Sequence, residues 1–207
     1  MSQNRKESED TPDISRRSFL KGVGIASIGV AVGSGITSEG VEGHSASEVL
    51  GPNKNKFSLS INGKDISVEA EPRQTLAEIL RDHLQMTGTK TACERGACGA
   101  CTVVMNGNTV PSCMTLAVDA IGAELETIEG LEKEGELHPI QQSFVDHDAL
   151  QCGFCTPGMI MSCKNLLDQN PSPNLEEIKL AVSGNLCRCG TYPKVFEAVS
   201  ALKNKGE

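Results

Sequence analysis

Nine cysteines in 207 residues are the feature that most limits how this chain can fold. Thiols at this density in small domains either bind metal or form disulfides. Such support is needed here, because aromatic residues make up only 3% of the chain and Trp is absent, so a small core would bury little apolar area. Eight of the cysteines fall into two groups of four, which are Cys93, Cys98, Cys101 and Cys113, and Cys152, Cys155, Cys187 and Cys189.

The first group begins with the spacing Cys-x4-Cys-x2-Cys, which is that of plant-type ferredoxins and predicts a 2Fe-2S cluster. Gly96 and Gly99 lie between these cysteines, and glycines let a tight loop bend and turn its amides toward the cluster sulphurs. Tetrahedral zinc on the same four thiols is the alternative. The spacing favours iron, because zinc sites usually present two short Cys-x2-Cys or similar pairs.

The second group joins a Cys-x2-Cys pair to a Cys-x-Cys pair thirty-one residues further on. Each pair lies where the chain enters or leaves a predicted helix. Taken alone, this pattern leaves a structural zinc site and disulfides open, but beside the first group it favours a second cluster. The ninth cysteine, Cys163, falls within a predicted helix, and we expect it to be a buried apolar residue rather than a ligand.

Alternating apolar and polar residues predict a small mixed sheet with one helix over residues 56–128. Asn62-Gly63 and Asn106-Gly107 are hairpin signals, and Thr75 with Glu78 three residues later is typical of a capped helix start. The expected elements are strands at 57–61 and 66–70, a helix from Thr75 with Leu76, Ile79, Leu80 and Leu84 on its apolar face, strands at 101–105 and 109–114, and a short strand at 125–128.

Residues 129–138 are rich in glycine and glutamate, as linkers often are, and we place the domain boundary there. Beyond them apolar residues recur at helical spacing, several times with Pro in the first turn. The expected helices are 139–150, 157–169, 174–182 and 193–203. The chain is therefore predicted to be α+β, with a mixed-sheet domain over 56–128 and a four-helix domain over 139–204.

The first 50 residues have the composition of a leader. Ser15–Lys21 reads S-R-R-S-F-L-K, which matches the twin-arginine export consensus, and an apolar, glycine-rich run follows over 22–36. That run is too short and too rich in glycine for a good membrane span. We expect a protein that is exported folded to the periplasm with its cofactors already inserted, without stable membrane insertion. No clean cleavage site stands out.

The net charge of -8 argues against binding to nucleic acid or to an anionic membrane, so the expected partners are proteins. The sequence contains no nucleophile–base arrangement and no flavin or nicotinamide motif that follows a predicted strand. We therefore expect that any catalytic step belongs to partner chains and that this chain has no catalytic residue.

Three runs of the sequence are specific enough to indicate a family. They are C-E-R-G-A-C-G-A-C at 93–101, Q-C-G-F-C-T-P-G at 151–158 and G-N-L-C-R-C-G at 184–190. Together they resemble the small subunit of the xanthine oxidase family of molybdenum hydroxylases, and the leader is similar to that of periplasmic aldehyde oxidoreductases. The resemblance covers nearly the whole chain from Lys56. It implies a ferredoxin-like β-grasp domain followed by a four-helix domain, each with one 2Fe-2S cluster.

The same resemblance implies the place of each site in an assembly. The second group of cysteines would lie nearer the molybdenum and the first group farther from it. Gln151 and Cys189 would contact the pterin of the molybdenum cofactor, molybdopterin, which a separate large subunit holds. The resemblance also implies a further partner, an FAD-binding subunit or another acceptor, which would receive the electrons.

The most specific expectation is the iron-sulphur electron-transfer subunit of a periplasmic, molybdenum-dependent aldehyde oxidoreductase. The same subunit in a hydroxylase of N-heterocycles, of isoquinoline type and without flavin, or in a xanthine-type hydroxylase is the alternative. From a different class, a structural module with zinc in both sites would use the same cysteines.

Overall fold

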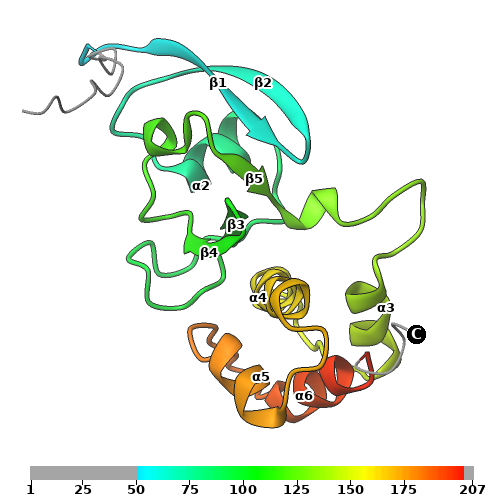
Figure 1. The fold of residues 1–207 in the computed structure, drawn as a ribbon. Coiled ribbons are helices and arrows are strands. Elements are labelled where there is room, and N and C mark those ends of the chain that lie inside the picture. The colour runs from blue at the N-terminus through cyan, green and yellow to red at the C-terminus, as the bar shows by residue number, and fades with distance from the viewer. Residues whose placement is uncertain (1–50, 203–207) are drawn as a thin grey trace, which may run out of the picture. The chain divides into compact units, whose positions relative to one another are not determined.

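Five strands form a mixed sheet in the N-terminal part of the chain (Figure 1): β1 (Asn55–Ile61), β2 (Lys64–Ala70), β3 (Thr102–Met105), β4 (Asn108–Pro111) and β5 (Glu124–Glu126). Their order is β2-β1-β5-β3-β4, with β1 and β5 parallel and the other neighbours antiparallel. The computed structural model describes residues 51–202. The predicted leader with its twin-arginine motif, and the end of the predicted 139–204 domain, lie outside the described residues.

Both predicted hairpins are present, and each turns at Asn-Gly. The φ angles of Asn62 and Gly63 are 52° and 73°, and those of Asn106 and Gly107 are 49° and 74°. Positive φ at both central residues is the turn geometry that Asn-Gly favours and that suits the twist of paired strands. Two short local signals therefore determine four of the five strands.

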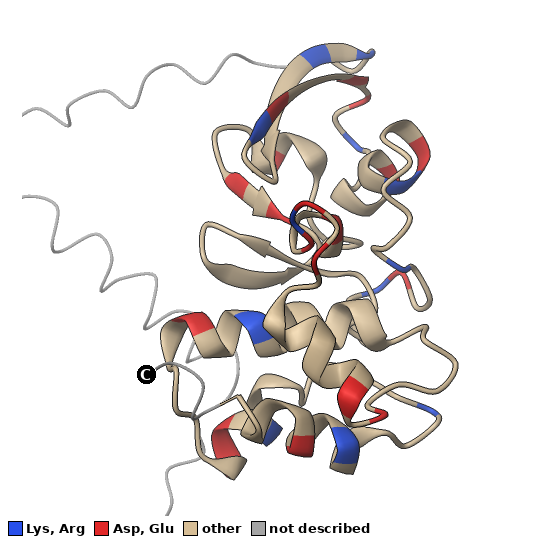
Figure 2. Ribbon diagram, turned by 90° about the vertical axis from the view of Figure 1, so that its right-hand side faces the viewer, with Lys and Arg blue, Asp and Glu red and all other residues tan. Residues whose placement is uncertain are grey.

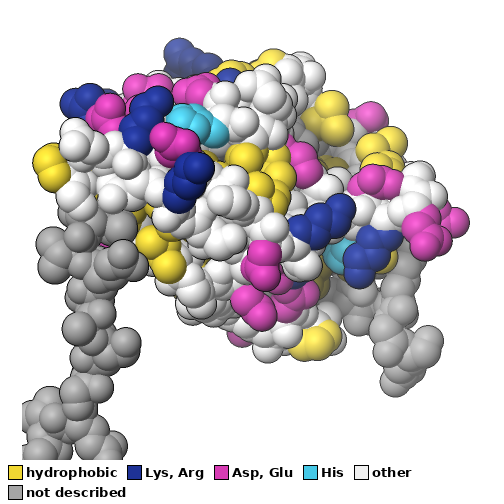
Figure 3. Space-filling view, turned by 90° about the horizontal axis from the view of Figure 1, so that it is seen from above, with side chains coloured by type: hydrophobic (Ala, Val, Ile, Leu, Met, Phe, Trp, Pro, Cys, Tyr) yellow, Lys and Arg dark blue, Asp and Glu magenta, His cyan; other side chains and the backbone are white. Residues whose placement is uncertain are grey.

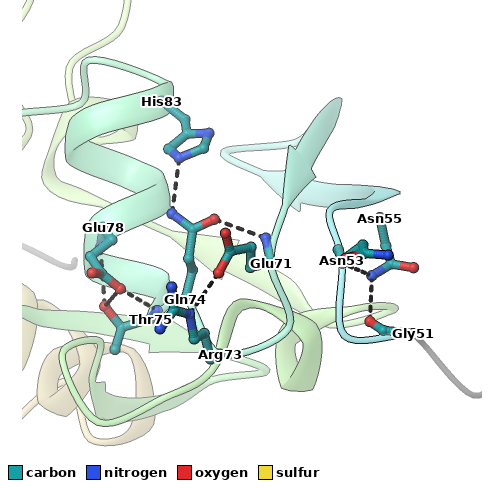
Figure 4. A network of polar contacts seen from close by, with 9 residues as sticks. All are labelled: Gly51, Asn53, Asn55, Glu71, Arg73, Gln74, Thr75, Glu78 and His83. Carbon is teal, nitrogen blue, oxygen red and sulfur yellow. Dashed lines mark hydrogen bonds and ion pairs between the residues drawn. The ribbon is translucent and has the colours of Figure 1, made fainter.

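The helix predicted from Thr75 begins there. The Glu78 N–H donates to Thr75 Oγ1 at 3.2 Å, and the Glu78 carboxylate accepts from the Thr75 N–H at 2.7 Å, which completes a capping box (Figure 4). The helix α2 (Leu76–Glu78) then widens into a π-helical turn, η1 (Ile79–His83). The sequence pattern predicted the capped start but not this widening.

The turn that enters α2 is held by side chains (Figure 4). Gln74 accepts a hydrogen bond from the Glu71 N–H at 2.9 Å, and its amide lies 3.1 Å from a ring nitrogen of His83. Between this helix and the sheet lies an apolar core, whose buried residues include Leu59, Ile61, Val68, Leu76, Ile79, Leu80, Val103 and Leu125. This core holds the helix against the sheet. The first group of cysteines lies in the loop that leads into β3 and just after β4.

The last strand is shorter than predicted. It ends at Glu126, because the N–H of Thr127 donates to the Asn62 side chain at 2.8 Å instead of to a neighbouring strand. Ile128 begins a 3-10 turn, η3 (Ile128–Gly130), and its side chain packs against the core of the helices. An apolar residue that we assigned to the strand therefore belongs to the connection between the two parts.

Four helices form the C-terminal part, which Figure 1 shows below the sheet: α3 (Pro139–Asp146), α4 (Thr156–Gln169), α5 (Leu175–Ala181) and α6 (Tyr192–Ser200). Three of them have Pro in the first turn, as the sequence predicted. The first helix ends earlier than expected, and Asp148 soon after it has a φ of 50°. The core includes Ile140, Phe144, Met159, Met161, Cys163, Ile178, Val195 and Val199.

Helix α4 packs against β3 and joins the two parts. Val104 of β3 belongs to the same buried core as the helices. Lys164 of α4 forms ion pairs with Asp168, at 2.7 Å, and with Glu126 of β5. The segment expected to be a linker is also anchored, since Leu131 is only 6% exposed and lies in the helical core.

The surface of the described residues carries charges of both signs. Acidic and basic residues are spread over the sheet and the helices (Figure 2), and on the face seen from above they alternate with apolar side chains (Figure 3). In the part of the chain that the structure describes, every helix is too short or too polar to cross a membrane.

Candidate metal centres

The four cysteines of the first group meet around the loop that leads into β3. Cys93 and Cys98 lie in this loop and are partly exposed, whereas Cys101 and Cys113 are 2% and 6% exposed. The two buried cysteines pack against Ala77 of α2. The helix and the second hairpin therefore hold two thiols at the base of the loop, while the other two lie nearer the surface.

Backbone N–H groups of this loop point at sulphur atoms. Positive φ angles at Glu94 (50°) and Gly96 (71°) curl the chain. The Gly96 N–H donates to Cys113 Sγ at 3.4 Å, and the Ala97 N–H donates to Cys93 Sγ at 3.3 Å. Such contacts stabilise negative charge on a thiolate sulphur.

The thiols of the first group interact two by two. Cys93 contacts Cys98, and Cys101 contacts Cys113. A backbone hydrogen bond from Arg95, together with the Cys98 thiol, lowers the pKa of Cys93 to about 7. Burial raises the pKa of Cys113 to about 11. The loop therefore favours a thiolate at its exposed end, while the base of the site is the more desolvated end.

The second group lies at the ends of two helices. Cys152 and Cys155 are in the turn that enters α4, and Cys187 and Cys189 are in the loop between α5 and α6. These thiols also interact in pairs, Cys155 with Cys187 and Cys152 with Cys189. The first pair is partly buried and the second is exposed. Gln151, which precedes the exposed pair in the chain, is exposed as well.

In the partly buried pair the pKa values of the two thiols are shifted in opposite directions. Burial raises the pKa of Cys155 to about 12. Burial acts in the same direction on Cys187, but hydrogen bonds led by those from Thr191 outweigh it and lower the pKa of this thiol to about 7. In the exposed pair, a backbone hydrogen bond from Phe154 lowers the pKa of Cys152.

Side chains outside the cysteine groups hold the second loop, and the sequence reasoning missed them. The Tyr192 hydroxyl accepts from the Cys187 N–H at 2.9 Å and donates to the Asn185 carbonyl at 2.9 Å. Thr191 Oγ1 lies 3.2 Å from Cys187 Sγ. The only available signal was their place beside the Cys-x-Cys pair, together with the fact that Tyr192 is the sole tyrosine of the chain.

The two cysteine loops touch each other. The Leu186 N–H donates to the Cys98 carbonyl at 2.8 Å, and the Asn185 amide donates to the Gly99 carbonyl at 2.9 Å. A Cβ at Gly158, in the first turn of α4, would lie 2.2 Å from the Gly99 carbonyl oxygen. This close approach therefore requires glycine at position 158, and it holds α4 and the loop of the first group together.

The thiol geometry fits a 2Fe-2S cluster in each group. All nine cysteines are free thiols. In each group the four sulphurs interact as two pairs. A 2Fe-2S cluster on four cysteines takes two thiolates at each of its two irons. Two pairs per group match that requirement.

Cys163 lies apart from both groups. It is completely buried in the helical core, where burial raises the pKa of its thiol to about 12. This placement agrees with the expectation of an apolar core residue.

Comparison with known families divides the chain where the sheet ends. Residues 59–127 match the family described as a 2Fe-2S iron-sulfur cluster binding domain, and residues 127–200 match the family described as a 2Fe-2S binding domain.

Comparison with characterised proteins is more specific. The chain is 48% identical over 144 residues to the nicotine 6-hydroxylase small subunit of Paenarthrobacter nicotinovorans. The match covers 70% of this chain and 87% of that protein. It is 41% identical over 158 residues to the aldehyde oxidoreductase iron-sulfur-binding subunit PaoA of Escherichia coli, and this match covers 69% of each protein. This chain belongs to the xanthine oxidase family of molybdenum hydroxylases. Within that family it is a small 2Fe-2S subunit.

Solved structures agree with the family assignment. The small subunit superposes on quinoline 2-oxidoreductase from Pseudomonas putida with a TM-score of 0.70 at 43% identity, over 75% of this chain and 99% of that one. It matches the aldehyde oxidoreductase of Desulfovibrio gigas with a TM-score of 0.69 at 38% identity, over 72% of this chain and 17% of that one. The predicted α+β class, with a ferredoxin-like domain followed by a helical 2Fe-2S domain, is confirmed.

Proposed function

We propose that this subunit relays electrons in a periplasmic, molybdenum-dependent aldehyde oxidoreductase and holds one 2Fe-2S cluster on each group of four cysteines. When bound, the two clusters would supply one-electron redox chemistry in series. The observation that supports the proposal best is the arrangement of the eight thiols as four pairs in two groups, with the Cys98 loop of one group in contact with the Cys187 loop of the other. The ligands would be Cys93, Cys98, Cys101 and Cys113 for the first cluster, and Cys152, Cys155, Cys187 and Cys189 for the second.

The second group would face the large molybdopterin subunit. Its Cys152–Cys189 pair is exposed, and apolar side chains lie beside it in the sequence, with Leu150, Phe154 and Leu186 exposed by 41%, 46% and 58%. Apolar side chains exposed around a redox site support a covering partner, because a partner would exclude water there. Gln151 and Cys189, both exposed, would contact the pterin of that partner.

The first group would deliver electrons outward, to an FAD subunit or another acceptor. Its loop is exposed at residues 94–97, next to the Cys93 thiol, while Cys101 and Cys113 remain buried. An exposed end on the first site and a separate exposed end on the second give the relay an entrance and an exit.

An N-heterocycle substrate is the second candidate. It is favoured by the relatives whose names include nicotine, nicotinate and quinoline, at 48%, 46% and 43% identity, against 41% for the aldehyde oxidoreductase subunit. The experiment is anaerobic reduction of the purified complex by an aromatic aldehyde, nicotinate or quinoline. Bleaching of the visible absorption by the aldehyde supports the first candidate and bleaching by a heterocycle supports the second. A complex without molybdenum overturns both.

Export to the periplasm is proposed from the Ser15–Lys21 motif. Replacing both arginines of the motif with lysine is expected to leave the chain in the cytoplasm, because the twin-arginine route depends on that pair. Cell fractionation with an antibody against the chain measures this. Unchanged periplasmic recovery of the double variant would contradict the proposed route.

A further inference from the structure

The hydroxyl of Thr191 is directed at a sulphur atom rather than at the helix that Thr191 precedes. Thr191 is the N-cap residue of α6, but its side chain makes no capping hydrogen bond, and its Oγ1 lies 3.2 Å from Cys187 Sγ. At Thr75, His138 and Asn174 the N-cap side chain does accept a hydrogen bond from its own helix. An N-cap threonine usually stabilises its helix by accepting a hydrogen bond from a backbone N–H of the first turn. At α6 the Thr191 hydroxyl contacts the cysteine sulphur instead of capping the helix.

Donors converge on one thiol of the partly buried pair. Cys187 Sγ is also approached by backbone hydrogen bonds from Thr191 and Gly190. For Cys155, the other member of the pair, the corresponding hydrogen bonds come from its own backbone and the Cys187 thiol. Negative charge on this pair is therefore stabilised mainly through Cys187.

We propose that the Thr191 hydroxyl raises the reduction potential of the second iron-sulphur centre by donating a hydrogen bond to the Cys187 thiolate. This inference rests on the proposed function, in which Cys187 binds iron. A thiolate bound to iron has no proton, so the hydroxyl must be the donor. Added electron density on the centre makes its sulphurs better acceptors, so the bond stabilises the reduced state more than the oxidised one. Thr191 acts through Cys187 and is a positioning residue.

The consequence concerns the direction of electron flow. The second centre is the one proposed to receive electrons from the molybdenum subunit, so a higher reduction potential favours that transfer. The residue next to Cys187, Leu186, donates its N–H to the Cys98 carbonyl. The hydroxyl therefore stabilises charge at the side of the second site that adjoins the first.

The test compares Thr191→Val and Thr191→Ser with the wild type in the complex as purified, by redox titration followed with electron paramagnetic resonance. Valine keeps the shape and removes the hydroxyl, and serine keeps the hydroxyl. At the wild-type midpoint of the second centre, valine is expected to raise the ratio of oxidised to reduced centre about three- to tenfold. Tenfold corresponds to 59 mV for one electron. Serine is expected to remain within about twofold of the wild type.

Two controls separate tuning from a structural effect. The first centre of the same molecule is expected to keep its midpoint in every variant. Thr115→Val is the matched variant. Thr115 lies two residues from Cys113, as Thr191 lies two residues from Cys189, but its hydroxyl donates to the Pro111 carbonyl and not to a sulphur. It is expected to leave both midpoints unchanged, and a shift of the second midpoint in this variant would contradict the assignment to Thr191.

The outcomes distinguish this inference from the proposed function. A wild-type complex without a second iron signal overturns the proposed function. A second signal that is present but keeps its midpoint in Thr191→Val overturns the role of Thr191 alone. If valine prevents the second centre from forming, Thr191→Ala is measured in its place and is expected to lower the midpoint. Loss of the second centre in both variants would assign Thr191 a structural role and would also overturn the inference.

Discussion

The backbone N–H of Leu186 donates to the carbonyl oxygen of Cys98 across 2.8 Å, which ties the loop of the second cysteine group to that of the first. Both residues belong to segments that the sequence assigned to different domains. Their contact, with that of Asn185 on Gly99, makes the two sites neighbours.

Replacing Cys98 with serine is expected to remove the first centre and leave the second. The thiols of the second group come from the start of α4 and the α5–α6 loop, and the carbonyl that accepts from Leu186 is kept in serine. Iron content is expected to fall by about half, with one of two paramagnetic signals remaining. Loss of both signals would show that the loops form only together.

Because α4 packs on the loop of the first group, alanine at position 158 is expected to cost much more stability than alanine at position 184. Gly158→Ala would place a methyl group 2.2 Å from the Gly99 carbonyl oxygen, whereas Gly184→Ala meets no heavy atom within 4 Å. Overpacking of this kind costs about 1–3 kcal/mol, and a substitution into open space costs less than about 0.5 kcal/mol. Thermal unfolding of both variants measures this. A Gly184→Ala variant destabilised as much as Gly158→Ala would count against the packing described.

Tyr192→Phe is expected to loosen the second centre selectively. The variant removes the hydroxyl that bridges the Cys187 N–H and the Asn185 carbonyl. Leaving the partly buried Cys187 N–H and Asn185 carbonyl without this partner is expected to lower the free energy of unfolding by about 1–3 kcal/mol. The second signal is therefore expected to disappear faster than the first when an iron chelator is added. Equal rates of loss at the two centres in the variant would argue that Tyr192 does not hold this loop.

Cys163 is expected to be chemically silent in the folded protein. Burial raises the pKa of its thiol from 9.0 to about 12, so the neutral form predominates below that range. Because the folded pKa lies above the unfolded one, the neutral thiol contributes its full stability below pH 9.0 and loses it as the pH rises toward 12. Mass spectrometry after iodoacetamide treatment at pH 8 is expected to find Cys163 modified only in denaturant.

The loss of stability at alkaline pH has its own control. Cys163→Ala removes the titrating thiol, so the variant is expected to lose less stability than the wild type as the pH rises above 9.0. It is also expected to retain both iron signals, since Cys163 lies outside both groups. Modification of Cys163 in the folded protein, or loss of iron in the variant, would contradict a core role.

Local chemistry made much of the fold predictable. Asn-Gly turns, the Thr75–Glu78 capping box and the prolines at helix starts act within a few residues, and each is found where the sequence placed it. The cysteine spacing likewise predicted two groups of four, and the structure brings the members of each together as pairs.

Contacts between distant residues could not be predicted in this way. Ile128 and Leu131 looked like a strand end and a linker residue, but both pack against helices whose position only the fold determines. The Tyr192 bridge and the Leu186–Cys98 bond depend on the path of loops without regular structure. A pattern of residue types carries no information on such paths, since loop conformation follows from what the loop packs against.

Metal and sulphide analysis of the matured complex, combined with electron paramagnetic resonance after reduction, tests the central claim most directly. If the eight paired cysteines hold two 2Fe-2S centres, each copy of the chain is expected to contain about four irons and about four inorganic sulphides and to give two distinct signals. Zinc in place of iron, or cystine bridges between the same side chains, would contradict the claim.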